Sequence, residues 1–184
     1  MIRLKFRAEK ATQVAAILID RAGGTMSVLT LVKLMYLIER RSLEKYGTPV
    51  IHDSYYNLPH GPIVSTSLNL INGDASAEDS VVWDQHISER DPDHNVSLMY
   101  PISFSVLSPA ELELLDEIYE QFGHMNRWQL RDHTHNLPEW TDPGDISTPL
   151  SYENVLRGIG KKEDEIEAVV SELRALSFAD GILE

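Results

Sequence analysis

The sequence contains no cysteine. Disulfide bonds, thiolate catalysis and cysteine-ligated zinc sites are therefore excluded. The sequence also lacks any apolar run close to the roughly 20 residues that are needed to span a bilayer. Its first residues, 1–7, alternate basic and apolar side chains without the apolar segment of a secretion signal. These absences predict a soluble, cytoplasmic protein.

Recognisable catalytic motifs are missing as well. The sequence has no HExxH pattern, no GxSxG nucleophile elbow, no P-loop and no GxGxxG loop. Among its seven histidines, His133 and His135 are the closest pair. Residues two positions apart do not share a helix face, so packing is the favoured interpretation of this pair and metal binding is the alternative. We therefore expect no catalytic residue, no metal and no cofactor, which means that the protein is not expected to be an enzyme.

Basic residues are scarce and unevenly placed. The chain has 16 Lys and Arg against 29 Asp and Glu, which gives a net charge of −13. Residues 1–60 hold nine basic and five acidic residues (+4), whereas residues 61–184 hold seven and 24 (−17). Such a field repels nucleic acid and attracts a basic protein surface, although the simpler alternative is that it only aids solubility. Direct DNA binding by the more basic N-terminal part is therefore disfavoured.

Start and stop signals for helices are clear along most of the chain. The apolar stretch of residues 28–38 follows a possible cap at Ser27 and ends before Gly47, which predicts a central buried helix. Capping boxes at Ser108 and Asn126 predict the starts of two further helices. The other predicted helices lie before Gly23, from Pro62 to Asn72, after Ser151 and at about residues 162–177.

One segment has the pattern of strands. Residues 80–90 and 96–102 flank turn residues at 91–95, which predicts a β-hairpin at about residues 80–102. A lone hairpin is marginal in water, so it must pack on helices or pair with another edge. The sequence has no internal repeat or long linker. It therefore predicts a single domain, residues 1–184, that is mainly α: a compact multi-helix fold with this small inserted hairpin.

Two blocks of the sequence resemble a known family. The first contains KLMYL at residues 33–37, YGTP at residues 46–49 and HGPIV at residues 60–64. The second is LRDHTHNLPEW at residues 130–140. Their order and spacing, within about residues 10–140, are similar to the signature of the Panacea domain, which is also called the SocA-like domain.

This resemblance implies an antitoxin. Members of the family are usually encoded beside a toxin in bacteria and their phages, and they neutralise it. The implied partner is a cognate protein toxin that is bound directly, and the acidic charge of the chain suggests that its surface is basic. The resemblance leaves an alternative open, in which the protein is a proteolytic adaptor that delivers its partner to an AAA+ protease, or a phage accessory interaction module without toxin neutralisation.

The turn before residue 63 is the main candidate for a partner surface. It combines tyrosines, which are common interface anchors, with a rigid Gly-Pro step, although core packing explains the same residues equally well. Two residues of the second block complete the candidate set. The predicted partner-binding residues are Tyr55, Tyr56, Leu58, His60, Gly61, Pro62, His133 and Trp140.

Overall fold

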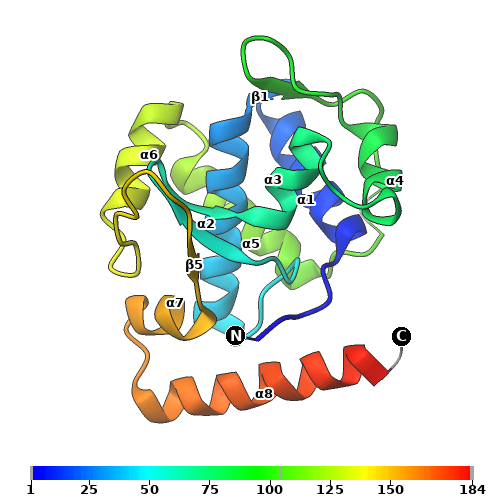
Figure 1. The fold of residues 1–184 in the computed structure, drawn as a ribbon. Coiled ribbons are helices and arrows are strands. Elements are labelled where there is room, and N and C mark those ends of the chain that lie inside the picture. Colours follow the sequence, from blue (N-terminus) through cyan, green and yellow to red (C-terminus); the bar gives the residue numbers. More distant parts are fainter. Residues whose placement is uncertain (1, 104, 183–184) are drawn as a thin grey trace.

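The computed structural model describes residues 2–103 and 105–182, and these residues form eight helices and five short strands (Figure 1). The fold is mainly α, as the sequence predicts. The elements in chain order are α1 (Ala8–Arg21), β1 (Thr25–Ser27), α2 (Val28–Tyr46), β2 (Tyr55–Leu58), β3 (Gly61–Val64), α3 (Ser65–Asn72), α4 (Ala77–His86), β4 (Asn95–Ser97), α5 (Pro109–Phe122), α6 (Arg127–His135), β5 (Thr148–Leu150), α7 (Tyr152–Gly158) and α8 (Glu163–Ile182).

Helix α2 runs through the middle of the molecule, with α1, α5, α6 and the β2–β3 hairpin around it (Figure 1). The hydroxyl of Ser27 accepts a hydrogen bond from the backbone N–H of Thr30 at 3.2 Å and caps the start of the helix. Gly47, in a left-handed conformation, ends it. Several of its side chains have no exposed surface, among them Leu31, Leu34, Met35 and Ile38. The apolar sequence and the two caps therefore predicted this helix correctly.

The strands form two small antiparallel sheets. In the larger sheet β2 is central, with β3 on one side and β5 on the other. In the smaller sheet β1 pairs with β4. The hairpin of β2 and β3 pairs Tyr55 with Val64 and Leu58 with Gly61, which leaves Pro59 and His60 as its two-residue turn. This hairpin carries most of the residues that the sequence proposed as a partner surface.

The prediction that a helix begins at Pro62 is wrong. Gly61 and Pro62 belong to strand β3, and helix α3 begins three residues later, at Ser65. Proline is tolerated there because β3 is an edge strand of its sheet, so a missing N–H does not interrupt a ladder on both sides. The start of α3 is instead capped from a distance, by the carboxylate of Asp53, which accepts from the backbone N–H of Thr66 at 2.7 Å. A cap from a residue so far away in the sequence cannot be predicted from a local pattern.

The β-hairpin predicted at about residues 80–102 is also wrong. Most of its first strand lies in helix α4, which Ser76 caps by accepting from the backbone N–H of Asp79 at 3.1 Å. The residues after the turn form β4, which pairs with the distant β1, and only a single bridge joins Ile87 to Leu98. The β-branched and aromatic run Val81-Val82-Trp83 is typical of a strand, but Trp83 enters the core from a helix.

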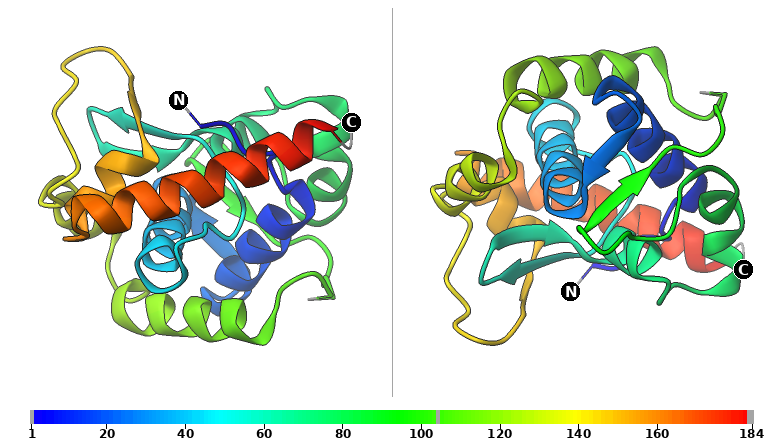
Figure 2. Two further views of the ribbon diagram at one scale, coloured as in Figure 1. Left: turned by 90° about the horizontal axis from the view of Figure 1, so that it is seen from below. Right: turned by 90° about the horizontal axis from the view of Figure 1, so that it is seen from above.

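Helix α8 lies across one face of the molecule, as a view from below shows (Figure 2). The helix was predicted at about residues 162–177, and it extends to Ile182. Its buried face, made by Ile166, Val170 and Leu173, packs beside α7. The N-terminal segment runs nearby, where the hydroxyl of Ser177 donates to the carbonyl of Arg3 at 2.5 Å. Within the described ranges, none of the helices has the length and apolar character required to cross a membrane.

Candidate functional site

The turn at Gly61 is where the two sequence blocks meet. The ammonium group of Lys33, from α2, donates to the carbonyl oxygen of Pro62 at 2.8 Å. The indole N–H of Trp140 donates to the carbonyl oxygen of Leu58 at 3.3 Å. The rings of His135 and Trp140 stack with centroids 4.2 Å apart and planes 4° apart. The turn of the hairpin is therefore held both by the central helix and by the segment at and after the end of α6.

Gly61 allows this close approach. A Cβ atom at this position would lie 2.8 Å from the Nζ of Lys33 and 2.8 Å from the hydroxyl oxygen of Thr134. The backbone also has φ +94°, a conformation that residues with a side chain rarely adopt. Both conditions require glycine. The Gly-Pro step thus brings the backbone of β3 directly onto Lys33.

Lys33 is an unusual component of a protein core. Its side chain has no exposed surface, and in the described part of the chain its ammonium group donates to a carbonyl rather than to a carboxylate. Burial lowers the pKa of Lys33 from 10.5 to about 7. A large share of the side chain is consequently neutral at physiological pH.

This pKa predicts a pH dependence of stability. Between pH 7 and 10.5 the unfolded chain keeps the proton on Lys33 while the folded chain releases it, so the free energy of unfolding should rise with pH. Between pH 7 and pH 9 we expect a gain of about 2 kcal/mol from this residue. Urea unfolding at pH 7, 8 and 9 measures it. Lys33→Met should abolish the gain, whatever its effect on stability at pH 7.

The exposed Lys162 supplies the matched control for this experiment. Lys162→Met removes the same group from a solvated position and should leave the pH dependence unchanged. If Lys33→Met kept the full wild-type slope, the buried amine would not be the source of the pH dependence.

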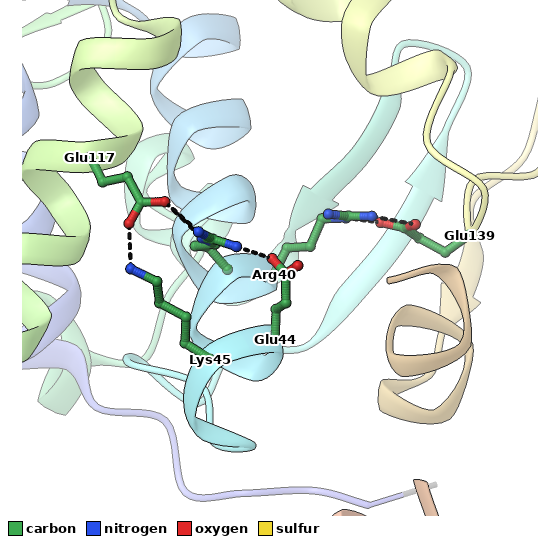
Figure 3. A network of polar contacts seen from close by, with 6 residues as sticks. Arg40, Glu44, Lys45, Glu117 and Glu139 are labelled. Carbon is green, nitrogen blue, oxygen red and sulfur yellow. Dashed lines mark hydrogen bonds and ion pairs between the residues drawn. The ribbon is translucent and has the colours of Figure 1, made fainter. Parts of the chain in front are cut away.

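A second buried polar group joins α2 to the segment after α6. The carboxylate of Glu139 accepts from the hydroxyl of Tyr36 at 3.0 Å. It also accepts from the Nε of Arg40 at 2.6 Å (Figure 3). The Glu139 side chain has no exposed surface, whereas that of Arg40 is 18% exposed. Gly158 of α7 lies directly against this carboxylate, where a Cβ atom would collide with it. The Glu139 carboxylate therefore brings together three parts of the chain, which are α2, the segment after α6, and α7.

Glu39, also on α2, organises the loop before the hairpin. Its carboxylate accepts from the backbone N–H groups of Val50 at 2.6 Å and Ile51 at 2.9 Å, and from the hydroxyl of Tyr55 at 3.0 Å. Burial raises the pKa of Glu39 to about 7, although these hydrogen bonds oppose the rise. The loop and the first residue of β2 are thus set by one side chain of the central helix.

Asp53, in the loop before the hairpin, binds the first turn of α3. Its side chain accepts from the backbone N–H of Thr66, and from both the backbone N–H and the hydroxyl of Ser67 at 2.9 and 2.6 Å. Its own backbone carbonyl accepts from the hydroxyl of Tyr152 at 2.9 Å. Burial raises the pKa of the Asp53 carboxyl. Hence the hairpin is flanked by a polar network whose members are mostly inside the protein.

The structure separates the predicted partner-binding residues into three groups. Tyr55 lies in the core, and Gly61 and Pro62 are buried in β3. His133 packs its ring against Phe122 of α5, with centroids 4.7 Å apart, rather than at the hairpin. The remaining residues have accessible surface around the hairpin and its anchor: Tyr56, Leu58, His60 and Trp140.

Sequence reasoning missed the buried polar residues. It predicted a buried helix from the apolar stretch of residues 28–38, without noticing that Lys33 and the adjacent Glu39 would themselves have no exposed surface. Their presence inside an apolar run was a usable signal, because charged residues are seldom fully buried without a structural or functional reason. The loop residues Asp53 and Glu139 gave no comparable local signal, since their partners are distant in sequence.

Comparison with known proteins identifies one family. The sequence model of the family described as antitoxin SocA-like, Panacea domain, matches residues 31–141. The chain belongs to this family. The matched part begins inside α2 and ends just after Trp140, so it contains Lys33, the hairpin and the anchoring segment. No curated protein and no solved structure is significantly similar to the chain.

Proposed function

We propose that this protein is an antitoxin that neutralises a cognate protein toxin by binding it directly. Family membership carries the proposal, because the matched family is described by an antitoxin-like domain over residues 31–141. The strongly acidic chain supports a partner with a basic surface, since opposite fields speed encounter and disfavour wrong partners.

We further propose that neutralisation involves no reaction catalysed by this chain. The buried ionisable groups that could suggest catalysis are engaged in holding structure together. Lys33 binds the backbone of β3, Glu39 binds the loop after α2, and Glu139 binds Tyr36 and Arg40. These hydrogen bonds hold the hairpin in place, with Tyr56, Leu58 and His60 accessible to a partner.

Co-expression with the protein encoded next to this chain tests the function. We expect the neighbouring protein to arrest growth when it is expressed alone, and this chain to restore growth to near the uninduced rate. The two proteins should also purify together. A neighbour that is harmless alone, or an arrest that this chain does not relieve, would contradict the proposal.

The amount of toxin during rescue identifies the mode of neutralisation. Direct binding leaves the toxin level unchanged, because the toxin is occupied rather than removed. A fall in toxin level that depends on a host AAA+ protease would instead indicate delivery by an adaptor.

A further inference from the structure

A second surface, separate from the hairpin, has the form of a docking groove. It has a volume of about 1180 Å³ and is lined by residues of α3, α4 and the loop of residues 88–94. Figure 1 shows helices α3 and α4 on the same side of the molecule. Its floor is apolar and well packed, and it is formed by Leu70, Ile71, Trp83 and Ile87. This volume exceeds the range of about 300–1,000 Å³ that is typical of small-molecule sites. The size favours a segment of another protein.

Exposed apolar side chains continue from the edge of this groove. Met99 lines the groove and is 44% exposed, and the adjacent Tyr100 is 64% exposed. Their segment is held against the end of α4, where the N–H of Met99 donates to the carbonyl of His86 at 2.7 Å. Methionine and tyrosine adapt well to a partner surface. The groove therefore has apolar contact area that is accessible and anchored.

The charge around the groove is almost entirely negative. Residues 72–94 contain seven acidic side chains and one basic side chain, that of Arg90. Arg90 is engaged within the lining, because it donates to the amide oxygen of Asn72 in α3 at 3.2 Å and to the Nδ1 of His94 in its own loop at 2.9 Å. Two of the acidic residues that line the groove, Asp84 and Glu89, are exposed. Neither forms an ion pair with any residue in the described ranges.

Not all acidic residues of the protein lack an ion-pair partner, as helix α5 shows. Three of its acidic side chains form ion pairs with basic residues of α1 and α2. The paired residues are Glu111 with Lys10, Asp116 with Arg21, and Glu117 with Arg41 and Lys45. The negative field is thus partly neutralised at α5 and remains uncompensated along the groove.

We propose that this groove docks a basic amphipathic segment of the partner protein. The partner's apolar side chains lie over Met99 and the groove floor, and its Lys or Arg side chains face Asp84 and Glu89. That the partner is a toxin rests on the proposed function, whereas the chemistry of the segment rests on the groove itself. An acidic peptide or a nucleic acid would be repelled by the same field.

A synthetic peptide tests the groove without any knowledge of the partner. The probe is a fluorescently labelled amphipathic peptide of leucine and lysine, and its affinity for the full chain is measured by fluorescence anisotropy. We expect saturable binding that weakens as salt rises. The charge-reversal pair Asp84→Lys/Glu89→Lys should weaken binding at least about tenfold. A peptide with glutamate in place of lysine should not bind.

The matched control moves the same charge reversal to α5. Glu113 and Glu120 are exposed like Asp84 and Glu89, and Glu113→Lys/Glu120→Lys changes the net charge equally. This control should weaken binding by less than about threefold, because only the long-range field changes. Circular dichroism and thermal unfolding verify that both pairs remain folded. Equal losses of affinity in the two double variants, or no saturable binding by the wild type, would refute the proposal that this groove docks a basic segment.

The same variants in the co-expression assay separate the two proposals. We expect the α5 control pair to relieve growth arrest like the wild type and the groove pair to fail. Full rescue by the groove pair would refute docking in the groove while leaving the antitoxin function intact. Groove-dependent peptide binding without rescue by the wild type would refute the antitoxin function while leaving the groove as a site for basic segments.

Discussion

Replacing Glu139 with alanine is expected to lower the free energy of unfolding by about 3–5 kcal/mol. The substitution leaves the guanidinium of Arg40 largely buried without its counter-ion, and it removes the acceptor of the Tyr36 hydroxyl. Both groups lost water on folding, so the cost is the penalty of leaving them unsatisfied rather than the value of one contact. Chemical denaturation at pH 7 measures the effect.

The control for Glu139 is Glu117 of α5, which lies on the other side of α2. Glu117 pairs with Arg41 and Lys45 at the surface, and both arms of the network appear in one view (Figure 3). Glu117→Ala should cost no more than about 1 kcal/mol, because solvent screens an exposed pair. Removing both partners of the buried pair, as in Arg40→Met/Glu139→Leu, should recover much of the stability. If Glu139→Ala cost no more than Glu117→Ala, the buried pair would not hold these segments together.

Gly61→Ala is expected to destabilise the protein by about 3 kcal/mol. One part of the cost is the backbone, since φ is +94°. The other part is space, because the new Cβ atom would lie 2.8 Å from the Nζ of Lys33 and from the hydroxyl of Thr134. The strand must then move away from α2 and stretch the bond between Lys33 and Pro62. Thermal and urea unfolding give the loss, and reduced binding should follow if the hairpin contacts the partner.

Gly24 separates these two contributions. It has the same φ of +94°, but a Cβ atom there would meet nothing within 4 Å. Gly24→Ala therefore reports backbone strain alone, about 1 kcal/mol. A similar loss at the two positions would mean that the approach of Lys33 and Thr134 to Gly61 is not a tight constraint.

Most helices of this fold could be predicted because their signals are local. The caps at Ser27, Ser108, Asn126 and Ser151 all receive hydrogen bonds from backbone N–H groups within three residues, as predicted. A cap and the turn that it stabilises are adjacent in the chain, so their pattern is visible in the sequence.

Strands β1, β4 and β5 could not be predicted in the same way, because their partners are distant in the sequence. β4 pairs with β1, about 70 residues earlier in the chain, and β5 completes the sheet of β2 from nearly 100 residues later. Short strands of three or four residues carry little pattern of their own. The segment around Trp83 shows a related limit, since its run of two valines and a tryptophan fits a strand until the cap at Ser76 is considered.

The candidate site was predictable in part. Resemblance of the two sequence blocks identified the family and drew attention to the turn at Gly61, and the structure brings both blocks to that turn. The core position of Tyr55 and the separate packing of His133 depend on neighbours from other helices. Those neighbours are not encoded near either residue, so their exposure could not be inferred locally.

By itself, the sequence determined a mainly α protein, its central helix, most helix ends, its acidic character and its family. Only the tertiary structure decided that Lys33, Glu39 and Glu139 form buried supports, and that the uncompensated acidic residues border a groove with exposed Met99 at its edge. The reason is physical. Helix propensity and capping act over a few residues, whereas burial, ion pairing and the local electric field depend on groups brought together from across the chain.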